Sequence, residues 1–414
     1  MRQSQLFNKT IKTAPKEEES INAQLLIRAG FIHKEMAGVW SFLPLGLRVI
    51  RKIENIIREE MNSIGGQELL MTVLQPKSLW QETGRWSNGM EAIIYKVENG
   101  ETGLGPTHEE EVCDIARTII KSKDDLPLYL YQIQSKFRKE LRAKSGLLRC
   151  REFEMKDLYS FHSSQKDFEK YYEIVKKSYF KIFKKFGLNS LLTQASGGEF
   201  TKDFTHEFQV LSPSGEDKII YCPSFHFSQN KEITKAKAGD KCPLCSKILK
   251  QGDAIEIGNI FPLGDKYSQK MNVSFTDEDG EKRNVIMGCY GIGISRMMGV
   301  IVEIYHDQNG IIWPKEVAPF SAHLIPIEIS NSKVRNAAEK IYQNLQKKNV
   351  DVLYDDRQNK SPGEKFVEAD LIGIPFRIVV SEKTLKNNCL ELKKRGSVKK
   401  ELIKIKDIFK KLNV

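Results

Sequence analysis

The sequence has no long apolar run, and nothing in it approaches the roughly 20 consecutive apolar residues that a membrane-spanning helix needs. Its first residues do not lead into the apolar stretch of a secretory signal. Cysteine is scarce, with seven among 414 residues, and this odd, mostly scattered set argues for reduced thiols and against a disulfide framework. No internal repeat is visible. We therefore expect a cytoplasmic protein without a membrane partner.

Positive charge, in contrast, is in excess, and the formal net charge is +11. Such an excess favours contacts with polyanions, including nucleic-acid backbones. It can equally reflect abundant lysines on solvated helix faces, so charge alone does not decide between the two. The length allows two or three domains and a substantial core.

A charged hairpin is predicted near the middle of the chain. Residues 128–137 alternate polar and apolar side chains, as a half-buried strand does, and a second strand follows from Phe153 to Phe161. Arginine forks hold phosphate oxygens bidentately, and a carboxylate can accept from an adenine amino group, so the hairpin suits a polyphosphate. On charge alone, a solvated hairpin is the simpler interpretation. Its charged residues include Arg138, Glu140, Arg142, Arg149, Arg151 and Glu152.

A glycine-rich segment later in the chain predicts a strand that turns directly into a helix. Glycines at 288, 291 and 293 allow a close approach of backbone, and the helix that follows positions Arg296. The spacing matches neither a dinucleotide-binding loop nor a Walker loop. Read alone, the segment is a weak signal.

Thr107 and Glu109 stand at the start of a helix predicted from His108 to Ile120. By spacing alone they are a helix start, with acidic residues near the positive end of the helix dipole. A hydroxyl and a carboxylate two residues apart could also hold a secondary ammonium at the mouth of a cleft.

Residues 212–253 shift in composition toward Lys, Ser, Gly and Cys. Cys242 and Cys245 have the spacing of a zinc knuckle, and Cys222 and His226 could complete a tetrahedral site. The first pair lacks its second cysteine, however, and one such pair is a weak signal. We therefore favour a metal-free segment and do not expect zinc as a cofactor.

Regular elements are predicted on both sides of this segment. Beyond residue 320, strands and helices alternate, which indicates a mixed α/β domain. Ser361 and Glu364 form a capping box at the start of one helix. The predicted helices are 20–29, 45–64, 108–120, 165–187, 333–348, 361–371 and 400–412; the predicted strands are 67–74, 128–137, 153–161, 191–194, 255–261, 323–327, 350–355, 376–381 and 389–394.

These segments together resemble the class II aminoacyl-tRNA synthetases. Phe137-Arg138-Lys139-Glu140 followed by Arg151-Glu152-Phe153 resembles their motif 2, and Glu152 to Phe161 resembles the prolyl-tRNA synthetase version. The helix and strand over 45–74 resemble motif 1, and residues 285–299 resemble motif 3 in its prolyl form. The resemblance runs from about residue 15 to the end of the chain, apart from a shortened insertion.

The resemblance implies an α/β (α+β) protein: a class II antiparallel sheet flanked by helices, then a mixed α/β anticodon-binding domain. The implied division is 1–211 and 254–315 for the catalytic domain, 212–253 for the shortened insertion and 320–414 for the anticodon-binding domain. The implied activity is ATP-dependent ligation of L-proline to tRNA(Pro) through prolyl-adenylate, with ATP and Mg²⁺, in a homodimer formed by the motif 1 helix and strand. The short insertion predicts no editing of mischarged alanine in cis.

Two other functions stay open at this stage. One is a synthetase-like paralogue that acts as a tRNA-binding or accessory protein, although the charged residues of motifs 2 and 3 are retained. The other is a related class II enzyme for threonine, glycine or histidine.

The resemblance also assigns roles to individual residues. Arg138 would contact the α-phosphate and the proline carboxylate, and Arg296 the γ-phosphate; these two are the expected catalytic residues. Asn259 stands where the family has a histidine. The remaining expected contacts are Glu140, Arg149, Arg151 and Phe153 for ATP, Thr107, Glu109, His162 and Cys289 for proline, and Glu207 and Glu256 for substrate or magnesium.

Overall fold

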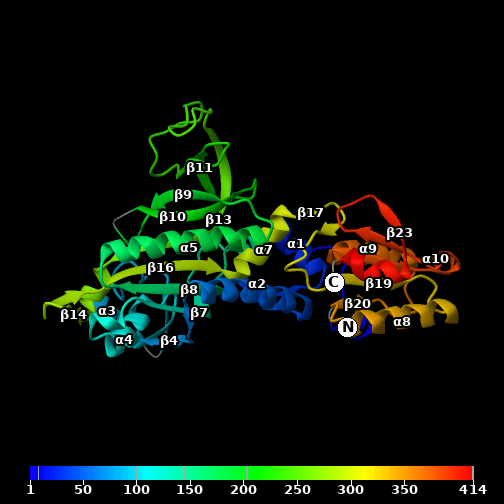
Figure 1. Ribbon diagram of the computed structural model, residues 1–414, viewed down its shortest axis with the longest axis horizontal. Coiled ribbons are helices and arrows are strands. Elements are labelled where there is room, and N and C mark those ends of the chain that lie inside the picture. The colour runs from blue at the N-terminus through cyan, green and yellow to red at the C-terminus, as the bar shows by residue number, and fades with distance from the viewer. Residues whose placement is uncertain (8, 98–99, 144, 199, 202–203, 413–414) are drawn as a thin grey trace. The chain divides into compact units, whose positions relative to one another are not determined.

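The computed structural model describes residues 1–412 except 8, 98–99, 144, 199 and 202–203. The chain forms two compact units (Figure 1). One comprises Met36–Val39 and Ile53–Val300, and the other comprises Met1–Glu35, Trp40–Lys52 and Ile301–Val414. The residues before 53 are thus shared between the units, whereas the sequence groups them with the catalytic domain. The sequence-based division remains a prediction.

The larger unit is built on a nine-stranded sheet of order β10-β9-β12-β11-β13-β16-β8-β7-β3. Its pairs are antiparallel except β9 with β12 and β3 with β7. The class II antiparallel sheet expected from the sequence is therefore confirmed. Its strands are β3 (Gln67–Glu68), β7 (Leu128–Phe137), β8 (Glu152–His162), β9 (Leu191–Ser196), β10 (Phe204–Leu211), β11 (Asp217–Tyr221), β12 (Ser228–Asn230), β13 (Lys250–Gly264) and β16 (Ile286–Gly293).

Strands β7 and β8 are the predicted charged hairpin. They pair antiparallel from Leu128 with Phe161 to Phe137 with Glu152, so the basic connection begins and ends at one point of the sheet. Helix α5 (Gln165–Lys185) follows β8 and packs on one face of the sheet, against β8, β13 and β16 (Figure 1). The opposite face carries the helix that follows Thr107, whose Val112, Cys113 and Ala116 belong to one buried cluster with Tyr159, Phe161 and Met287 of the sheet.

Two further helices agree with the expectations from the sequence. The predicted helix at 108–120 is α4 (Glu109–Ile119), which begins directly after Thr107 and His108. The predicted strand–helix junction is also present: β16 ends at Gly293, and α7 (Ile294–Ile304) begins at the next residue. Two shorter helices are α3 (Lys77–Thr83) and α6 (Lys266–Lys270), and the short strands are β4 (Leu74–Pro76), β5 (Tyr95–Val97), β6 (Thr102–Leu104), β14 (Ser274–Thr276) and β15 (Lys282–Asn284).

The strand predicted over 67–74 is mostly wrong. Only β3 pairs with β7, and β4 belongs to a different, three-stranded sheet. The Met71 N–H donates to the side-chain Oε1 of Gln132 at 3.0 Å. The Leu69 N–H still donates to the Tyr131 carbonyl of β7 at 2.9 Å, but the Met71 N–H meets a side chain, so main-chain pairing with β7 ends before Met71.

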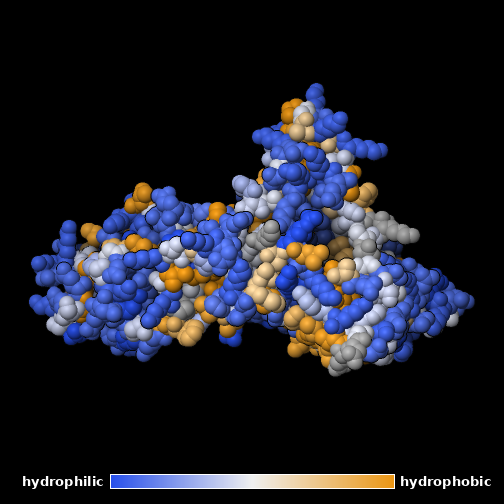
Figure 2. All heavy atoms as spheres, turned by 180° about the vertical axis from the view of Figure 1, so that it is seen from behind, coloured by the Kyte–Doolittle hydropathy of each residue, from blue (hydrophilic) through white to orange (hydrophobic). Residues whose placement is uncertain are grey.

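Residues 212–253 extend the main sheet through β11 and β12 and then form a small lobe, drawn at the top of Figure 1. A small cluster of buried side chains lies within the lobe, formed by Ile220, Cys222, Cys242 and Leu249. In Figure 2 its surface is mostly hydrophilic, with some hydrophobic atoms near the tip. Phe225, Leu244 and Ile248 are the large exposed hydrophobic residues there.

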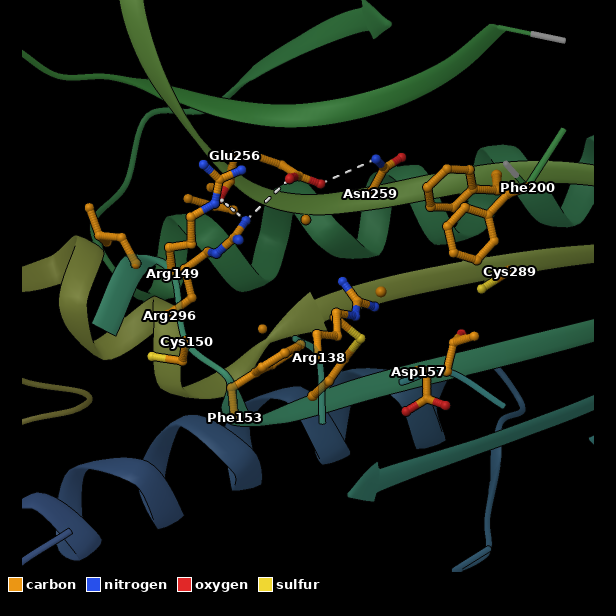
Figure 3. A pocket seen from close by; sticks show the side chains of 18 of the residues that line it. Arg138, Arg149, Cys150, Phe153, Asp157, Phe200, Glu256, Asn259, Cys289 and Arg296 are labelled. Atoms are coloured by element: carbon orange, nitrogen blue, oxygen red, sulfur yellow. Dashed lines mark hydrogen bonds and ion pairs between the residues drawn. The ribbon is translucent and has the colours of Figure 1, made fainter. Parts of the chain in front are cut away.

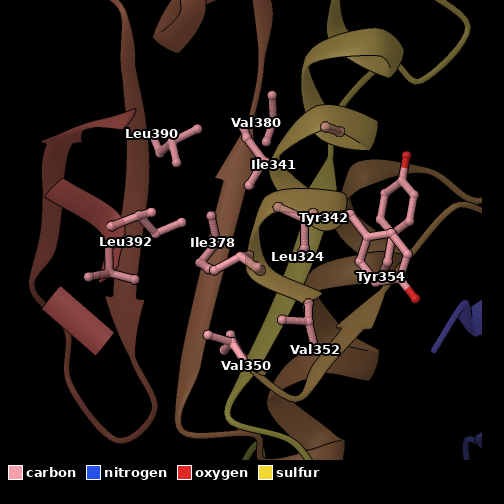
Figure 4. Close-up of a cluster of buried hydrophobic side chains, with 14 of the residues drawn as sticks. Leu324, Ile341, Tyr342, Val350, Val352, Tyr354, Ile378, Val380, Leu390 and Leu392 are labelled. Atoms are coloured by element: carbon pink, nitrogen blue, oxygen red, sulfur yellow. The ribbon is translucent and has the colours of Figure 1, made fainter. Parts of the chain in front are cut away.

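The smaller unit contains the predicted mixed α/β domain. Its five-stranded sheet has the order β20-β19-β21-β22-β23, and a compact apolar cluster packs on it (Figure 4). The capping box is confirmed, since the Ser361 hydroxyl accepts from the Glu364 N–H at the start of α9. The elements are β19 (Ala322–Pro326), β20 (Val352–Tyr354), β21 (Phe376–Val380), β22 (Cys389–Lys394), β23 (Lys400–Lys404), α8 (Ser332–Lys347), α9 (Pro362–Ile372), α10 (Glu382–Lys386) and α11 (Ile408–Leu412).

The helix predicted over 400–412 is wrong for its first half. Residues 400–404 are β23, an edge strand that pairs antiparallel with β22, and only residues 408–412 form an α-helix. Pairing satisfies main-chain donors and acceptors of β22 and buries Ile403 opposite Leu390. Tertiary pairing thus overrides the helical preference of the lysine-rich sequence.

The N-terminal elements follow the prediction more closely. Helix α1 (Ile21–Arg28) begins after Ser20, although the Ser20 side chain accepts no capping hydrogen bond. The long motif 1 helix is α2 (Pro44–Ser63). Across the described ranges, no helix combines the length and apolar character needed to cross a membrane. The remaining short strands are β1 (Ile32–Met36), β2 (Val39–Phe42), β17 (His306–Asp307) and β18 (Gly310–Ile311).

Candidate active site

A cavity of roughly 290 Å³ lies on the face of the main sheet opposite α5. It is lined by side chains from the β7–β8 hairpin, from β13 and β16, and from the first turn of α7 (Figure 3). Most of the residues singled out in the sequence line it: Thr107, Glu109, Arg138, Glu140, Arg149, Phe153, Glu256, Cys289 and Arg296.

Strand β8 provides one wall of the cavity by simple alternation. Phe153, Met155, Asp157 and Tyr159 line the cavity, because every second side chain of a strand points to the same face. The even-numbered residues point to the other face of the sheet; Lys156, for example, donates a hydrogen bond to Tyr179 of α5.

His162 is one of these even-numbered residues, and it does not line the cavity. Its Nδ1 lies 2.6 Å from Asp167 Oδ2 in the first turn of α5, and its ring packs near Tyr129, Phe168 and Tyr171. The structure therefore separates His162 from the other residues expected to contact proline.

Arg138 stands where β7 ends, at the middle of the cavity (Figure 3). Its Nε donates to the Pro106 carbonyl at 3.1 Å, and its guanidinium carbon lies 5.2 Å from the centre of the Phe153 ring. Burial, and then the positive charge of Arg296, lower the pKa of Arg138. An arginine stays protonated even so, so an anion bound between Arg138 and Arg296 would relieve their repulsion.

Arg296 reaches the cavity from the first turn of α7. Its Nη1 lies 3.2 Å from Glu256 Oε2, and Glu256 also accepts from Asn259 Nδ2 at 3.2 Å (Figure 3). Asn259 in turn accepts from the Thr205 hydroxyl at 2.7 Å. The residue that departs from the family pattern is thus built into a hydrogen-bonded row on β13 and still lines the cavity.

The basic connection between β7 and β8 divides into two groups. Glu140 pairs with Arg149 at 3.1 Å, and both line the cavity. Arg151 Nε instead donates to the Glu140 main-chain carbonyl at 3.0 Å, and Arg151 is not one of the lining residues. Arg151 therefore shapes the connection, while Arg149 faces the cavity.

The other end of the cavity is formed by the segment before α4. The Thr107 hydroxyl donates to the Glu109 carboxylate at 2.7 Å, and the Cys289 thiol donates to it at 3.4 Å. Glu109 is fully buried. In Figure 3, Cys289, Asp157 and Phe200 lie on one side of Arg138, and Phe153 and Arg296 lie on the other. The cavity thus has two ends, with Arg138 between them.

Arg85 is a functional candidate that the sequence did not indicate. It is buried, and its Nη1 lies 3.2 Å from Glu109 and 3.0 Å from Glu110. Burial opposes its charge, but Glu110 and Glu109 together raise its pKa above the ordinary value. Its guanidinium also packs against the rings of Trp80, Phe200 and Tyr267. No local pattern marks Arg85, because the contact comes from tertiary packing alone.

Asp157 is a second residue that sequence reasoning missed. It accepts from Gln132 at 3.0 Å and from Tyr159 at 2.9 Å, and it pairs with Lys136 at 2.9 Å. Its position in phase with Phe153 and Met155 on β8 is the signal that could have found it. This buried network holds the floor of the cavity in one arrangement.

Two further carboxyl groups lie near the Arg296 end. Burial, and then the charges of Glu256 and Asp217, raise the pKa of Glu207 to about 8. Burial, and then Glu256, raise the pKa of Asp217 to about 6. Neither residue lines the cavity. Three carboxyl groups thus crowd one region, and a cation there would relieve their repulsion.

Of the four zinc candidates from the sequence, the structure brings the three cysteines together but not His226. The ligand atoms of Cys222, Cys242 and Cys245 all lie within 4.8 Å of one another. His226 does not belong to this group and is exposed.

Comparison with known proteins agrees with this geometry. Residues 95–305 match the family described as "tRNA synthetase class II core domain (G, H, P, S and T)", and residues 321–414 match "Anticodon binding domain". A proline–tRNA ligase of Ehrlichia chaffeensis is 42% identical over 427 residues, which span 100% of both chains. The chain belongs to the proline–tRNA ligase family. The resemblance noted in the sequence is therefore confirmed.

Other members of the family differ in length. The proline–tRNA ligase of Wolbachia pipientis wMel is 42% identical over 410 residues, 96% of each chain. The proline–tRNA ligase of a Sulfurihydrogenibium species is 35% identical over 557 aligned positions, covering 99% of this chain and 98% of the relative. That alignment is much longer than the 414 residues present here.

Solved structures of prolyl-tRNA synthetases have the same fold as this chain. Cryptosporidium parvum prolyl-tRNA synthetase complexed with halofuginone and AMPPNP has a TM-score of 0.78 at 20% identity, covering 95% of this chain and 76% of that one. Giardia lamblia prolyl-tRNA synthetase in complex with prolyl-adenylate has a TM-score of 0.77 at 22% identity, with coverages of 92% and 74%.

Proposed function

We propose that this chain joins L-proline to tRNA(Pro) in two steps, by way of prolyl-adenylate. The observation that carries the proposal is the placement of Arg138 and Arg296 around one cavity whose far end holds the Thr107–Glu109 pair. The names of full-length relatives, and the prolyl-adenylate and AMPPNP bound in the neighbouring structures, support the same function.

In the first step the proline carboxylate attacks the α-phosphorus of ATP, and the bond to pyrophosphate breaks. No covalent bond to the protein is needed, so the chain contributes alignment and charge neutralisation. Arg138 lies between the two ends of the cavity (Figure 3). Its guanidinium can therefore bridge the carboxylate and the α-phosphate, which have to meet there.

The nucleotide would occupy the Phe153–Arg296 end. Phe153 offers a ring for the adenine to stack on, and the Glu140 carboxylate would accept from the adenine amino group. Glu140 is held in place by Arg149 at 3.1 Å. Arg296 would bind the γ-phosphate. Its guanidinium would then contact both the phosphate and the Glu256 carboxylate.

The amino acid would occupy the opposite end. A buried carboxylate needs a partner cation, and Glu109 is placed to pair with the secondary ammonium of proline together with the Thr107 hydroxyl. Cys289 would form an apolar wall beside the pyrrolidine ring. Arg85 already neutralises part of the charge and fixes the direction of the Glu109 carboxylate.

Magnesium fits the residues at the Arg296 end. Carboxylate and phosphate oxygens are the ligands Mg²⁺ prefers, and Glu256 would share the ion with the phosphates. Burial and the charge of Glu256 raise the pKa of Glu207 to about 8, so the positive charge of an ion at Glu256 would also act on Glu207. A bound ion would supply neutralisation of the charge on the leaving pyrophosphate.

Transfer to tRNA requires a partner surface as well. The net charge of +11 favours a nucleic-acid backbone, and the C-terminal domain would hold the anticodon.

We also propose a homodimer through α2 and the segment after it, where Leu70 and Leu74 expose 73% and 48% of their surface. Sedimentation at equilibrium would show twice the chain mass; a monomer at micromolar concentration would contradict the dimer.

The short segment 212–253 supports the further proposal that alanine errors are not cleared in cis. The purified enzyme should therefore leave alanyl-tRNA(Pro) intact. We expect the reaction to take place in the cytoplasm.

Amino-acid-dependent pyrophosphate exchange tests the activity itself. The chain, ATP and Mg²⁺ are incubated with each of the twenty amino acids separately, and exchange is expected with proline. Exchange with threonine, glycine or histidine instead would make the chain a different class II enzyme. The absence of exchange with all twenty, together with tRNA binding, would make it an accessory protein.

A further inference from the structure

The lobe formed by residues 222–249 contains two turns that each begin at a cysteine. In the first, the Cys222 N–H donates to the Phe227 carbonyl at 2.8 Å; in the second, the Cys242 N–H donates to the Lys247 carbonyl at 2.7 Å. Each bond spans five residues, and each turn contains one residue with φ of 60°, which is Phe225, three residues after Cys222, and Ser246, four residues after Cys242. A cysteine therefore begins each turn, and the two turns are closed by the same outer hydrogen bond but differ inside.

The two turns face each other through their sulfur atoms. Cys222 Sγ lies 3.4 Å from Cys245 Sγ, and all three sulfurs, with that of Cys242, lie within 4.8 Å of one another. A tetrahedral zinc site with Zn–S bonds of about 2.3 Å places its sulfurs about 3.8 Å apart. The spacing of the three sulfurs is therefore close to what one ion would need.

Main-chain donors also point at this group. The Ser224 N–H donates to Cys222 Sγ at 3.4 Å. Such N–H groups stabilise negative charge on sulfur, which a metal-bound thiolate carries and a thiol does not. The turn is thus arranged for a thiolate.

Two simpler explanations account for less of this arrangement. Cysteines often pack as small apolar side chains, but packing alone does not require three sulfurs from two turns to converge. A disulfide can join only two of the three and would leave the third beside it. The apolar cluster of the lobe is also small, and small cores commonly depend on a metal or a disulfide for stability.

We propose that Cys222, Cys242 and Cys245 bind one Zn²⁺ ion as thiolates, with a solvent molecule as fourth ligand. The second turn supplies two ligands, and the first supplies only Cys222, because Phe225 occupies the position equivalent to Cys245. The ion ties the two turns together and replaces the apolar core that so short a segment cannot build. It has no part in the chemistry of the cavity, and this inference does not depend on the proposed function.

Metal content tests the site directly. The full chain is produced in zinc-supplemented medium, freed of loosely held ions, and analysed by mass spectrometry of the elements. We expect one zinc per chain, and a fall of at least about tenfold in Cys242→Ser and in Cys245→Ser. Cys389→Ser is the matched control, because Cys389 lies in the other unit with its thiol directed to the Asn387 carbonyl, and it should keep its zinc.

A second measurement needs no substitution. Replacing the ion with Co²⁺ in the wild-type chain should give the intense thiolate-to-cobalt absorption of a four-coordinate site. His226→Ala should leave zinc content and cobalt spectrum unchanged, whereas loss of the ion would overturn the assignment of the fourth ligand to solvent. A reduced wild-type chain without zinc and without the cobalt spectrum, or with a Cys222–Cys245 disulfide in its place, would overturn the site.

Discussion

Replacing Arg85 with methionine should weaken proline binding, although Arg85 does not line the cavity. The Arg85 side chain is only 8% exposed, and it holds two buried carboxylates, Glu109 at 3.2 Å and Glu110 at 3.0 Å. Methionine keeps the length and apolar character of the side chain but removes the charge. Arg85 is a positioning residue, because it acts on proline only through Glu109.

The size of the effect follows from these contacts. Removing one partner of a buried ion pair costs about 3–5 kcal/mol of stability, since the remaining charges stay buried. A hydrogen bond to a charged group contributes about 1.5–3 kcal/mol, so misplacing Glu109 should raise the KM for proline roughly 10- to 150-fold. The KM for ATP should stay the same, because Arg85 lies at the proline end of the cavity.

Urea unfolding and pyrophosphate exchange measure the two effects separately. Arg117→Met is the matched control: Arg117 pairs with Glu82 at 2.7 Å, but both side chains are about one-third exposed, so the loss should be about 0–1 kcal/mol with no change in KM. An Arg85→Met chain with the wild-type KM for proline would refute the role given to Arg85. A change in kcat alone would refute it as well.

Three further predictions concern other parts of the chain. Phe153→Ala should raise the KM for ATP in exchange by roughly tenfold or more, because a stacked base contributes about 1–3 kcal/mol, whereas Phe153→Tyr should not. Burial, and then Glu256 and Asp217, raise the pKa of Glu207 from 4.5 to about 8, so its ionisation lowers stability progressively between those pH values. The midpoint of thermal unfolding of Glu207→Gln should therefore exceed the wild-type value more at pH 8 than at pH 5; an equal difference at both would contradict this. Ser361→Ala should cost about 1 kcal/mol in urea unfolding, because it removes a capping box, and no loss would show that the cap contributes nothing.

Much of the fold could be predicted because local and tertiary preferences agree. Strand β7 spans the predicted residues 128–137, since alternation on one face coincides with pairing to β8. Where they disagree, prediction fails. In residues 400–406, Ile403 and Ile405 alternate with lysines, which is a strand signal, but the lysine-rich composition suggests a helix. Only pairing with β22 decides the matter.

The site was predictable to the extent that its residues lie in continuous motifs. Arg138, Phe153 and Arg296 come from such motifs, and one cavity brings them together. The resemblance places His162 among the proline contacts, but the phase of β8 turns it toward α5. Arg85 could not be found, because its contacts join segments that no local pattern connects.

Proline-dependent pyrophosphate exchange by Arg138→Ala and Arg296→Ala tests the central claim most directly, with Arg142→Ala, an exposed arginine of the same connection, as control. If both guanidiniums hold one nucleotide, exchange should fall at least about a hundredfold in each of the first two variants and persist in the third, with circular dichroism unchanged. Wild-type exchange in either Arg138→Ala or Arg296→Ala would contradict the claim.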